Sequence, residues 1–329
     1  MRMSTLGFSW LVVKLPPLLH VNCCMGTIIT VMDKFKMKDL SRTSAAGIVL
    51  YHPDVSSVKR VVGSVLRQVS FVLLVDNTPG CDLSQDFKGL QGVEYLANRD
   101  NLGIAKALNQ LMSRASELGF EWLLTLDQDS IFPEEGIGLY EKVISEHEEP
   151  IAIACPVFID RKTQSKYGEE GFVECCITSG ALTSVSAWFE VGGFNEWFFI
   201  DLVDFEFCAR LRKAGYFIYQ SNSVVLSHQI GNPKRIRLFG RTFSSSNHPP
   251  MRYYYQARNY LVFEYLYGLE TTNPSPRGLV IKAVIVDDDK FKKLKAIIQG
   301  CIDAKKAIKL MKKSASSHLA SKHFDAETG

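Results

Sequence analysis

The stretch EWLLTLDQDS, residues 121–130, places a short apolar run directly before two carboxylates. Large apolar residues over 122–126 are typical of a strand that is buried on both faces of a parallel sheet. Asp127 and Asp129 follow at the carboxyl end of this strand, where open α/β sheets bind ligands. Two acids are common in plain turns and helix caps, but at a buried strand end they are costly to desolvate unless a cation compensates. The stretch therefore predicts a divalent metal that carries an anionic ligand, such as a nucleotide diphosphate.

Strand and helix patterns on the N-terminal side of this stretch predict a parallel sheet. Residues 45–51 and 71–75 are apolar strand patterns, and apolar residues recur at helical spacing over 55–68 between them. A strand, a helix and a strand without a hairpin turn form a βαβ unit, so the sheet begins parallel. A short strand over 93–96 and a helix over 104–118 lead back to the opening stretch.

Three predicted strand ends bring polar residues to one edge of this sheet. They are YHP at 51–53, DN at 76–77 and DQD at 127–129. Because parallel strands present their carboxyl ends at the same edge, we predict a nucleotide-sized pocket there, edged with carboxylates.

Three acids lie where residues 198–210 enter a predicted helix that ends at Gly215. Asp201, Asp204 and Glu206 would favour the helix dipole and cap free amides, worth about 0.3–1 kcal/mol each. Three acids beside four phenylalanines exceed what capping requires, so we predict a functional role for them.

The remaining C-terminal elements are simpler to predict. We expect a helix over 134–146, strands over 151–157 and 224–226, and a helix from the 248–259 region toward Gly268. A loop with basic residues at Lys234, Arg235, Arg237 and Arg241 should precede that last helix. The block HPPMRYYYQARN at 248–259 combines arginines with tyrosines, which suits phosphate binding and an exposed basic, aromatic face equally well.

Residues 290–313 carry nine lysines and one acid, with apolar residues at helical intervals. A basic amphipathic helix predicts contact with an anionic membrane surface. A helix that packs on the domain and keeps its lysines in water fits the same pattern.

The composition is that of a globular protein and excludes several other classes. The 329 residues can build a sizeable core, and 46% hydrophobic with 22% charged residues argues against disorder. The net charge of +3 is too small to imply a nucleic-acid partner. The eight cysteines form no CxxC pair, which disfavours zinc and a secreted disulfide framework and favours free thiols in a reducing compartment.

Residues 1–43 do not share the pattern of the rest, and we expect a poorly ordered leader or a start placed too far upstream. The apolar run at 6–13 is shorter than the roughly 20 residues that cross a bilayer. No clean small-residue cleavage site supports a signal peptide. The expected organisation is this leader, an α/β domain over 44–270 with halves that meet at 130/131, and a helical basic extension over 271–329.

Several blocks, in this order, resemble the family 2 glycosyltransferases with the GT-A fold, and among them the rhamnosyltransferase-like branch of bacterial polysaccharide synthesis. The resemblance covers 46–259 and weakens up to about 304. It departs from the family at His52, where Asn is more usual, and at Val203, where Glu is more usual. The blocks are GIVLYHPD, LLVDN, NRDNLGIAKALN, DQDS, TSGALTS, VGGFNEWFFIDLVDFEFCARLRKAGY, the stretch with His228, and HPPMRYYYQARN.

This resemblance implies a Rossmann-like, mixed and mostly parallel sheet flanked by helices, with a helical C-terminal extension. It implies Mg²⁺ or Mn²⁺ as cofactor, held by the DxD acids Asp127 and Asp129 with His228. The implied nucleotide-sugar contacts are Tyr51 and Pro53 near the base, Asp76 near the uracil or thymine ring, Asn77, Asn101, Gly103, Lys106 and Asp127, and Arg252 and Arg258 at the diphosphate.

The implied reaction moves a sugar to a hydroxyl with inversion, and a carboxylate takes the proton of that hydroxyl. Asp204 is the predicted base, with Asp201 as the other candidate. The expected donor is dTDP-L-rhamnose and the expected acceptor a lipid-linked glycan of O-antigen or related polysaccharide, in the cytoplasm or at the inner face of the plasma membrane.

Three alternatives remain open at this point. UDP-glucose, UDP-N-acetylglucosamine or UDP-galactofuranose would be donors within the same family. A nucleotidyltransferase would need a glycine-rich basic loop where YHPD stands at 51–54. The third is a non-catalytic protein that binds nucleotide sugars.

Overall fold

The structure is a computed structural model, and the predicted leader lies outside its described residues as far as residue 38. Leu40–Thr43 form the short helix α2. The predicted boundaries at 130/131 and 270/271 stay predictions. The structure describes residues 39–329 apart from 161–163, 229–233, 239–240, 269–273 and 328–329, and does not describe the side chains of 228, 234–235, 238, 241–244 and 314–327.

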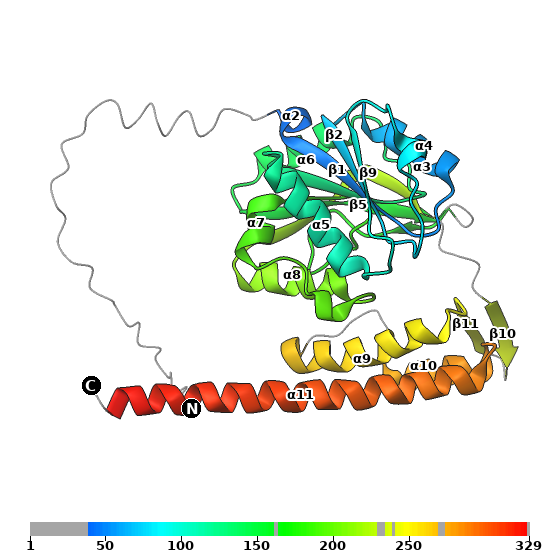
Figure 1. The fold of residues 1–329 in the computed structure, drawn as a ribbon, viewed down its shortest axis with the longest axis vertical. Helices are drawn as coiled ribbons and strands as arrows, with labels where there is room; N and C mark the ends of the chain where they lie inside the picture. The colour runs from blue at the N-terminus through cyan, green and yellow to red at the C-terminus, as the bar shows by residue number, and fades with distance from the viewer. Residues whose placement is uncertain (1–38, 161–163, 229–233, 239–240, 269–273, 328–329) are drawn as a thin grey trace, which may run out of the picture. The chain divides into compact units, whose positions relative to one another are not determined.

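A mixed β-sheet forms the centre of the molecule (Figure 1). Its strands lie in the order β3-β2-β1-β4-β8-β5-β9-β7, with β6 beside β5. The strand bounds are β1 Ser44–Leu50, β2 Phe71–Asp76, β3 Val93–Ala97, β4 Trp122–Asp127, β5 Ile151–Asp160, β6 Lys166–Tyr167, β7 Gly171–Phe172, β8 Ala181–Ser184 and β9 Phe217–His228.

The N-terminal half of the sheet is parallel, which confirms the prediction. β1 pairs in parallel with β2 and with β4, and β2 pairs in parallel with β3. β8 lies antiparallel between β4 and β5, whereas β5 and β9 are parallel. The sheet is therefore mixed, and the carboxyl ends of β1, β2 and β4 meet at one edge.

Helices cover both faces of the sheet. α5, α7 and α8 lie on one face, and α3 and α6 on the other (Figure 1). The helix bounds are α3 Val55–Val65, α4 Ser84–Phe87, α5 Ile104–Glu117, α6 Gly136–Glu146, α7 Val185–Glu190, the 3₁₀ helix η2 Glu196–Phe198, α8 Val203–Lys213, α9 Pro250–Tyr267, α10 Pro276–Ile285 and α11 Lys290–Glu327.

The alternation of side chains along β2 shows how the two faces are filled. Leu73 and Val75 belong to the core that contains the buried face of α5. Val72 and Leu74 point the other way and join the core under α3 and α6. A strand with two apolar faces requires a helix layer on each side, which is why these strands read as unbroken apolar runs.

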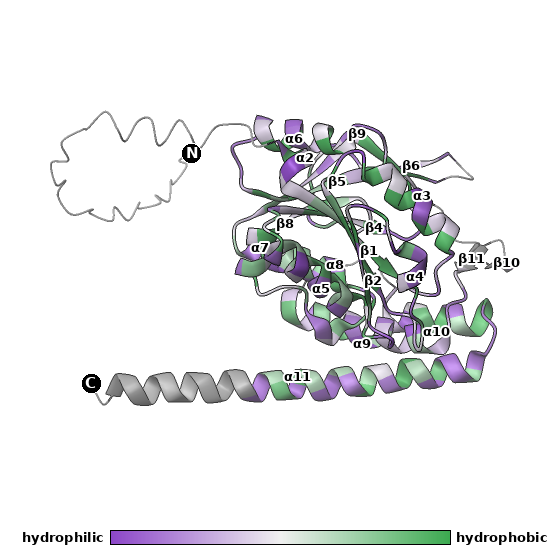
Figure 2. Ribbon diagram, turned by 45° about the horizontal axis from the view of Figure 1, so that its top comes forward, coloured by the Kyte–Doolittle hydropathy of each residue, from purple (hydrophilic) through white to green (hydrophobic). Residues whose placement is uncertain are grey.

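The C-terminal helices form a further layer that packs on the α5 and α8 side through α9. Val262 and Phe263 of α9 and Ala304 of α11 are buried in the same core as α5. Gly300 allows α11 to approach α9 closely, because a Cβ atom there would lie 2.4 Å from the carbonyl oxygen of Tyr254. Figure 2 shows apolar and polar residues alternating along the described part of α11.

Some predicted elements have different bounds or a different type. β8, Ala181–Ser184, forms from the last four residues of the TSGALTS block, for which no element was predicted. The strand expected over 224–226 is part of the much longer β9. The basic loop was predicted wrongly: β10 Lys234–Leu238 and β11 Arg241–Ser245 form an antiparallel pair. Ile236 and Leu238 alternate with arginines, a strand pattern that the density of basic residues obscured.

The cysteines and the possibility of a membrane-spanning helix were also considered from the sequence. The cysteines in the described part of the chain are free, and Cys155, Cys176 and Cys208 are buried, as expected. Within the described residues, no helix is long and apolar enough to span a lipid bilayer.

Candidate active site

The loops that follow β1, β2 and β4 are hydrogen-bonded to one another, as the sequence predicts. The backbone N–H of Tyr51 donates to Oε1 of Gln128 at 2.9 Å, and Nε2 of Gln128 donates to the carbonyl oxygen of Tyr51 at 3.3 Å. The N–H of His52 donates to Oγ1 of Thr78 at 2.7 Å. Gln128, between the two DxD acids, thus joins the loop after β4 to Tyr51. The side chain of Tyr51 is exposed and can contact a ligand.

Pro53 leads from this edge into α3. The next residue, Asp54, caps the helix by accepting hydrogen bonds from the backbone N–H groups of Ser56 and Ser57, both at 3.2 Å. Capping of this kind satisfies amides that have no partner within the helix. The cap fixes the direction of the chain directly after Tyr51 and Pro53, and their contact with a base stays a prediction.

Asp76 and Asn77 at the end of β2 are buried and use their polar atoms within the protein. Asp76 accepts from the N–H of Thr78 and from the hydroxyl of Tyr95, both at 2.8 Å. Asn77 donates to the carbonyl oxygen of Gly103 at 3.0 Å. Asn101 accepts from the N–H of Gly103 at 3.1 Å. These contacts shape the loops around the edge, and direct contacts of these residues with a nucleotide stay predictions.

Gly103 is needed where the loop enters α5. Its φ of +84° favours glycine, and a Cβ atom there would lie 2.5 Å from the ring of Phe199. The carbonyl oxygen of Phe199 accepts hydrogen bonds from the N–H groups of Ile104 at 2.7 Å and of Ala105 at 3.4 Å. A loop from the far half of the domain therefore caps the N-terminus of α5.

That loop, residues 196–202, holds a strained backbone. Phe199, Asp201 and Leu202 all have positive φ, between 62° and 64°. Each such non-glycine residue costs on the order of 1–3 kcal/mol, and such conformations persist only when their surroundings fix them. Asn259 of α9 supplies this: its fully buried Nδ2 lies 2.8 Å from the carbonyl oxygens of Phe198, Ile200 and Asp201.

Arg252 of α9 forms a bidentate ion pair with Asp201. Nη2 lies 2.9 Å from Oδ1, and Nε lies 3.1 Å from Oδ2. The side chain of Asp201 is only 6% exposed. The structure thus pairs two predicted site residues with each other. Because Arg252 neutralises Asp201, Asp201 is less suited to take a proton than an unpaired carboxylate would be.

Arg258 is placed differently from the expectation that it binds a diphosphate. It is buried, and its guanidinium lies 3.8 Å from the ring centroid of Trp197. It donates to the backbone carbonyls of Trp197 and Phe198 and to the side chain of Asn259. The structure therefore gives Arg258 a role in holding the loop 196–202, and a direct phosphate contact stays a prediction.

Asp204 lies in the first turn of α8, directly after this loop, and is partly exposed. Burial of the carboxyl group raises the pKa of Asp204 to about 6, hydrogen bonds with backbone N–H groups oppose the shift, and the negative charges of Asp201 and Asp127 add to it. Carboxyls from the end of β4, from the loop and from α8 are therefore close enough to influence one another. A pKa of about 6 suits a group that accepts a proton near neutral pH.

Asp204 and Asp201 line a cleft of about 410 Å³. Arg252 and apolar residues from α5 and from the segments around residues 177 and 200 complete the lining. Volumes of this size are typical of small-molecule sites with few polar groups among apolar walls. The cleft is the candidate active site.

Glu206 is separated from the other two acids, although the sequence groups all three. It is 1% exposed, binds the guanidinium of Arg210 through both oxygens at 2.9 and 2.7 Å, and accepts from the hydroxyl of Tyr267 at 2.9 Å. Two residues along a helix is about 200°, so Asp204 and Glu206 face nearly opposite directions. Glu206 joins α8 to α9, so the functional role predicted for all three acids does not extend to it.

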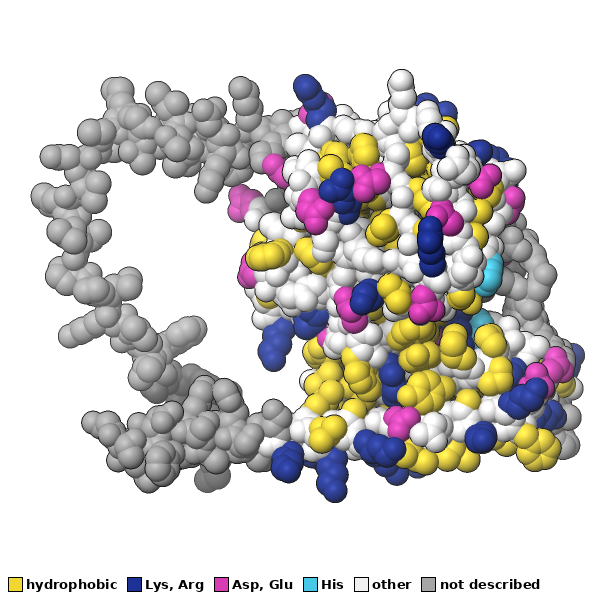
Figure 3. All heavy atoms as spheres, in the orientation of Figure 1, with side chains coloured by type: hydrophobic (Ala, Val, Ile, Leu, Met, Phe, Trp, Pro, Cys, Tyr) yellow, Lys and Arg dark blue, Asp and Glu magenta, His cyan; other side chains and the backbone are white. Residues whose placement is uncertain are grey.

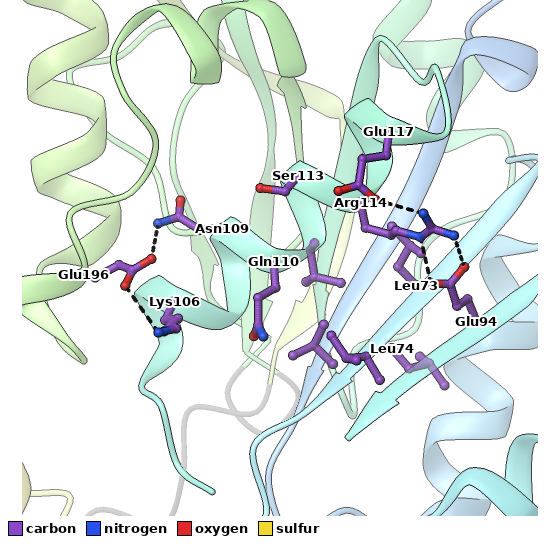
Figure 4. A pocket seen from close by; sticks show the side chains of 13 residues that line it. Leu73, Leu74, Glu94, Lys106, Asn109, Gln110, Ser113, Arg114, Glu117 and Glu196 are labelled. Atoms are coloured by element: carbon purple, nitrogen blue, oxygen red, sulfur yellow. Dashed lines mark hydrogen bonds and ion pairs between the residues drawn. The ribbon is translucent and has the colours of Figure 1, made fainter. Parts of the chain in front are cut away.

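Lys106, predicted to contact the nucleotide sugar, lies outside the acid cleft. Ile104 and Leu108 of α5 line that cleft, and Lys106, halfway between them, faces away from it. Lys106 lines a separate cleft of about 380 Å³ between α5 and the strands β2 and β3 (Figure 4). There its Nζ lies 4.0 Å from a carboxylate oxygen of Glu196, whereas Arg114 and Glu94 pair farther along the helix.

The predicted metal ligands are brought together only in part. Asp127 and Asp129 flank Gln128 at the edge, and Asp129 is exposed. His228 ends β9, and its side chain is outside the described residues. In the part of the chain that is described, no group of three or more His, Cys, Asp or Glu side chains is arranged to hold a metal ion. Two carboxylates with room for substrate oxygens fit Mg²⁺ or Mn²⁺, which rarely use an all-protein cage with a phosphate substrate.

The residues that sequence reasoning missed are Gln128, Phe199 and Asn259. Gln128 and Asn259 both stand in blocks that resemble the family, between the DxD acids and at the end of HPPMRYYYQARN. A polar amide directly before the apolar and aromatic run YLVF at 260–263 was a signal that Asn259 has a fixed partner. Nothing in the sequence indicates that the carbonyl oxygen of Phe199 caps α5.

Replacing Asn259 with leucine is expected to lower kcat at least tenfold and to leave nucleotide affinity nearly unchanged. The loop 196–202 would lose the amide group that lies against three of its carbonyl oxygens. Each buried carbonyl left without a hydrogen bond costs about 1–3 kcal/mol of stability. The position of Asp204 would then vary. Steady-state kinetics and calorimetric nucleotide titration measure the two quantities.

The matched control for this change is Leu279→Ala in α10. This change removes a buried side chain of the C-terminal core without altering a residue of the loop. It should lower the free energy of unfolding by about 2–5 kcal/mol. Equal losses of kcat in the two variants would mean that Asn259 acts through stability alone.

Three comparisons with known proteins agree with this geometry. The family model for glycosyl transferase family 2 matches residues 48–213, half of the chain, and covers both DxD acids, Asp201 and Asp204. The dTDP-rhamnosyl transferase RfbF of Shigella flexneri is 29% identical over 233 residues, which are 65% of this chain and 77% of that protein.

The structural similarity is of the same kind. A crystal structure of GalNAc-T7 with UDP, GalNAc and Mn²⁺ has a TM-score of 0.52 and 15% identity and matches 77% of this chain. The chain spans about half the length of that protein, 53%. The sheet and its flanking helices agree with the family match. The chain belongs to glycosyl transferase family 2 and is a glycosyltransferase with the GT-A fold.

Proposed function

We propose that this glycosyltransferase moves L-rhamnose from dTDP-L-rhamnose to a hydroxyl of a growing glycan, with inversion at the anomeric carbon. The observation that carries the mechanism is that Asp204 lines the cleft with a pKa raised by burial and, in smaller part, by the negative charges of Asp201 and Asp127. The named activity of RfbF, which matches 65% of this chain and 77% of its own length, supports the choice of sugar.

Asp204 is the proposed general base. As the acceptor oxygen bonds to the anomeric carbon, its proton passes to the Asp204 carboxylate. The bond from that carbon to the diphosphate breaks, and its electron pair leaves with the diphosphate. Such proton transfer contributes about 10²–10⁴-fold. Arg252 neutralises Asp201, which limits the repulsion that Asp201 would otherwise exert on the ionised base.

Asp127 and Asp129 are the proposed ligands of Mg²⁺ or Mn²⁺. When bound, the ion neutralises charge on the leaving diphosphate. Tyr51, exposed at the same edge and joined to Gln128, is proposed to stack on the base. The proposed acceptor is a lipid-linked glycan of a cell-surface polysaccharide, met in the cytoplasm at the inner face of the plasma membrane.

Titration of dTDP, UDP and GDP, each with and without Mn²⁺, tests the donor. We expect metal-dependent binding that prefers dTDP, measured by calorimetry. A preference for UDP would keep the fold and the base and replace rhamnose by glucose, N-acetylglucosamine or galactofuranose. Absence of binding for all three nucleotides would contradict the proposed site.

A further inference from the structure

Helix α11 has an inner face that packs on α9 and an opposite face that meets solvent. Lys293, Ile297, Gly300 and Ala304 are buried on the inner face. Lys293 is neutralised there by Asp287, with Nζ 3.5 Å from Oδ2. The inner face is therefore fully used within the molecule.

Among the described residues, the opposite face carries apolar side chains that are exposed. Residues 291, 295, 298, 302, 305 and 309 follow at intervals of three and four, which places them on one side of the helix. Phe291 is 90% exposed, Ile298 59% and Ile302 42%. We call this set the outer stripe; its members are Phe291, Lys295, Ile298, Ile302, Lys305 and Lys309.

The preceding helix, α10, also exposes apolar side chains. Val280, Ile281 and Val284 of α10 are 37%, 48% and 45% exposed, while Leu279 and Ala283 on the other face are buried. Figure 3 shows apolar and basic side chains gathered along α11. Single exposed apolar residues are normal, but a set on two consecutive helices indicates an interaction surface.

The charge of the chain is concentrated on this element. Residues 290–313 carry a net charge of +8, from nine lysines and Asp303, whereas the whole chain carries +3. The remainder is therefore net acidic, at −5. Asp303 pairs with Lys306, and residues 290–313 contain no other carboxylate that could neutralise the lysines of the outer stripe. Such a charge distribution orients the protein toward an anionic surface.

The combination of the two features selects the partner. A second copy of the chain, docked stripe to stripe, would bring like charges together. Nucleic acid would attract the lysines but offer little to Phe291, Ile298 and Ile302. An anionic bilayer takes both, because apolar side chains enter the boundary between headgroups and acyl chains while lysines meet the phosphates.

We propose that the outer stripe of α11 docks the protein on an anionic phospholipid surface. This site is separate from the acid cleft, so the proposal stands independently of the donor sugar and of the catalytic base. It gives a reason why a helix of an otherwise well-packed layer leaves a phenylalanine in water.

Flotation of the full chain with lipid vesicles tests the proposal. We expect binding to vesicles of phosphatidylcholine mixed with phosphatidylglycerol, no binding to phosphatidylcholine alone, and loss of binding as salt is added. Substitution of Lys295, Lys305 and Lys309 by glutamine should weaken binding about 100-fold. Phe291→Ser with Ile298→Ser and Ile302→Ser should weaken it at least about tenfold.

A matched control removes the same charge elsewhere. Substitution of the exposed Lys59, Lys88 and Lys142 by glutamine should leave vesicle binding unchanged. Circular dichroism and nucleotide titration should be the same for all variants, which shows that the fold and the donor site are intact.

Several results would overturn the proposal. Equal binding to neutral and anionic vesicles, or equal weakening by the control and the stripe variants, would exclude the stripe as the docking site. Failure of the full chain to bind anionic vesicles would do the same. If the protein did not bind vesicles and formed a dimer in light scattering that the triple serine variant abolished, the stripe would be a contact with a second copy. If the protein bound DNA tightly and only the lysine variant abolished this binding, the stripe would be a nucleic-acid site.

Discussion

Replacing Asp204 with asparagine is expected to lower turnover by about 10²–10⁴-fold and to leave nucleotide affinity within a few-fold of the original. Asparagine keeps the shape of the side chain but cannot accept the acceptor's proton. The proposed nucleotide contacts lie at the other end of the site, at Tyr51 and the DxD acids, so the substitution should leave them intact. Steady-state release of dTDP from dTDP-L-rhamnose and calorimetric titration of dTDP provide the two measurements.

Thermal melting separates this loss from damage to the fold. Because the pKa of Asp204 is raised to about 6, its ionised form costs stability above that pH, and the cost disappears as the pH falls below the ordinary value near 4. Asp204→Asn should therefore melt no lower than the original protein at pH 7 and above. A large fall in melting temperature, or a parallel loss of nucleotide binding, would assign Asp204 a structural or metal-binding role.

Replacing Asp129 with alanine is expected to reduce metal-dependent nucleotide affinity by about 10²-fold or more. The side chain is exposed in the turn after β4, so its removal opens no cavity. It would remove one of the two carboxylates that can hold a divalent cation against a diphosphate. Titration of dTDP with Mn²⁺ measures the change.

Asp86→Ala is the matched control for this substitution, because it removes an exposed acid from α4 that is not among the predicted site residues. Its nucleotide affinity should equal that of the original protein. If Asp129→Ala retained the full metal-dependent affinity, the metal would have other ligands and the DxD acids would be turn formers.

The parallel part of the sheet and its functional edge could be predicted because they depend on local pattern. The apolar run before Asp127 is typical of a strand with helices on both faces, and β1, β2 and β4 do meet as expected. The hydrogen bonds between Tyr51 and Gln128 follow from that register. Connection rules alone bring these loops together.

The roles of charged residues farther along could not be predicted, because each depends on a partner distant in sequence. Arg252 and Asp201 are 51 residues apart. The sequence groups Glu206 with Asp201 and Asp204, but its hydrogen bonds with Arg210 and Tyr267 direct its side chain away from them. The loop 196–202 has a strained backbone without glycine, so its shape comes from Asn259 and the contacts with α5.

The pH dependence of donor turnover, compared between the original protein and Asp204→Asn, tests the assignment of the base most directly. Release of dTDP from dTDP-L-rhamnose, or of the nucleotide from whichever donor the titrations select, should rise with pH and level off. The midpoint should lie at or below about 6, since a cation on Asp127 would offset one of the charges that raise the pKa of Asp204. The residual activity of Asp204→Asn should lack this rise. The same rise in both proteins would show that another group takes the proton.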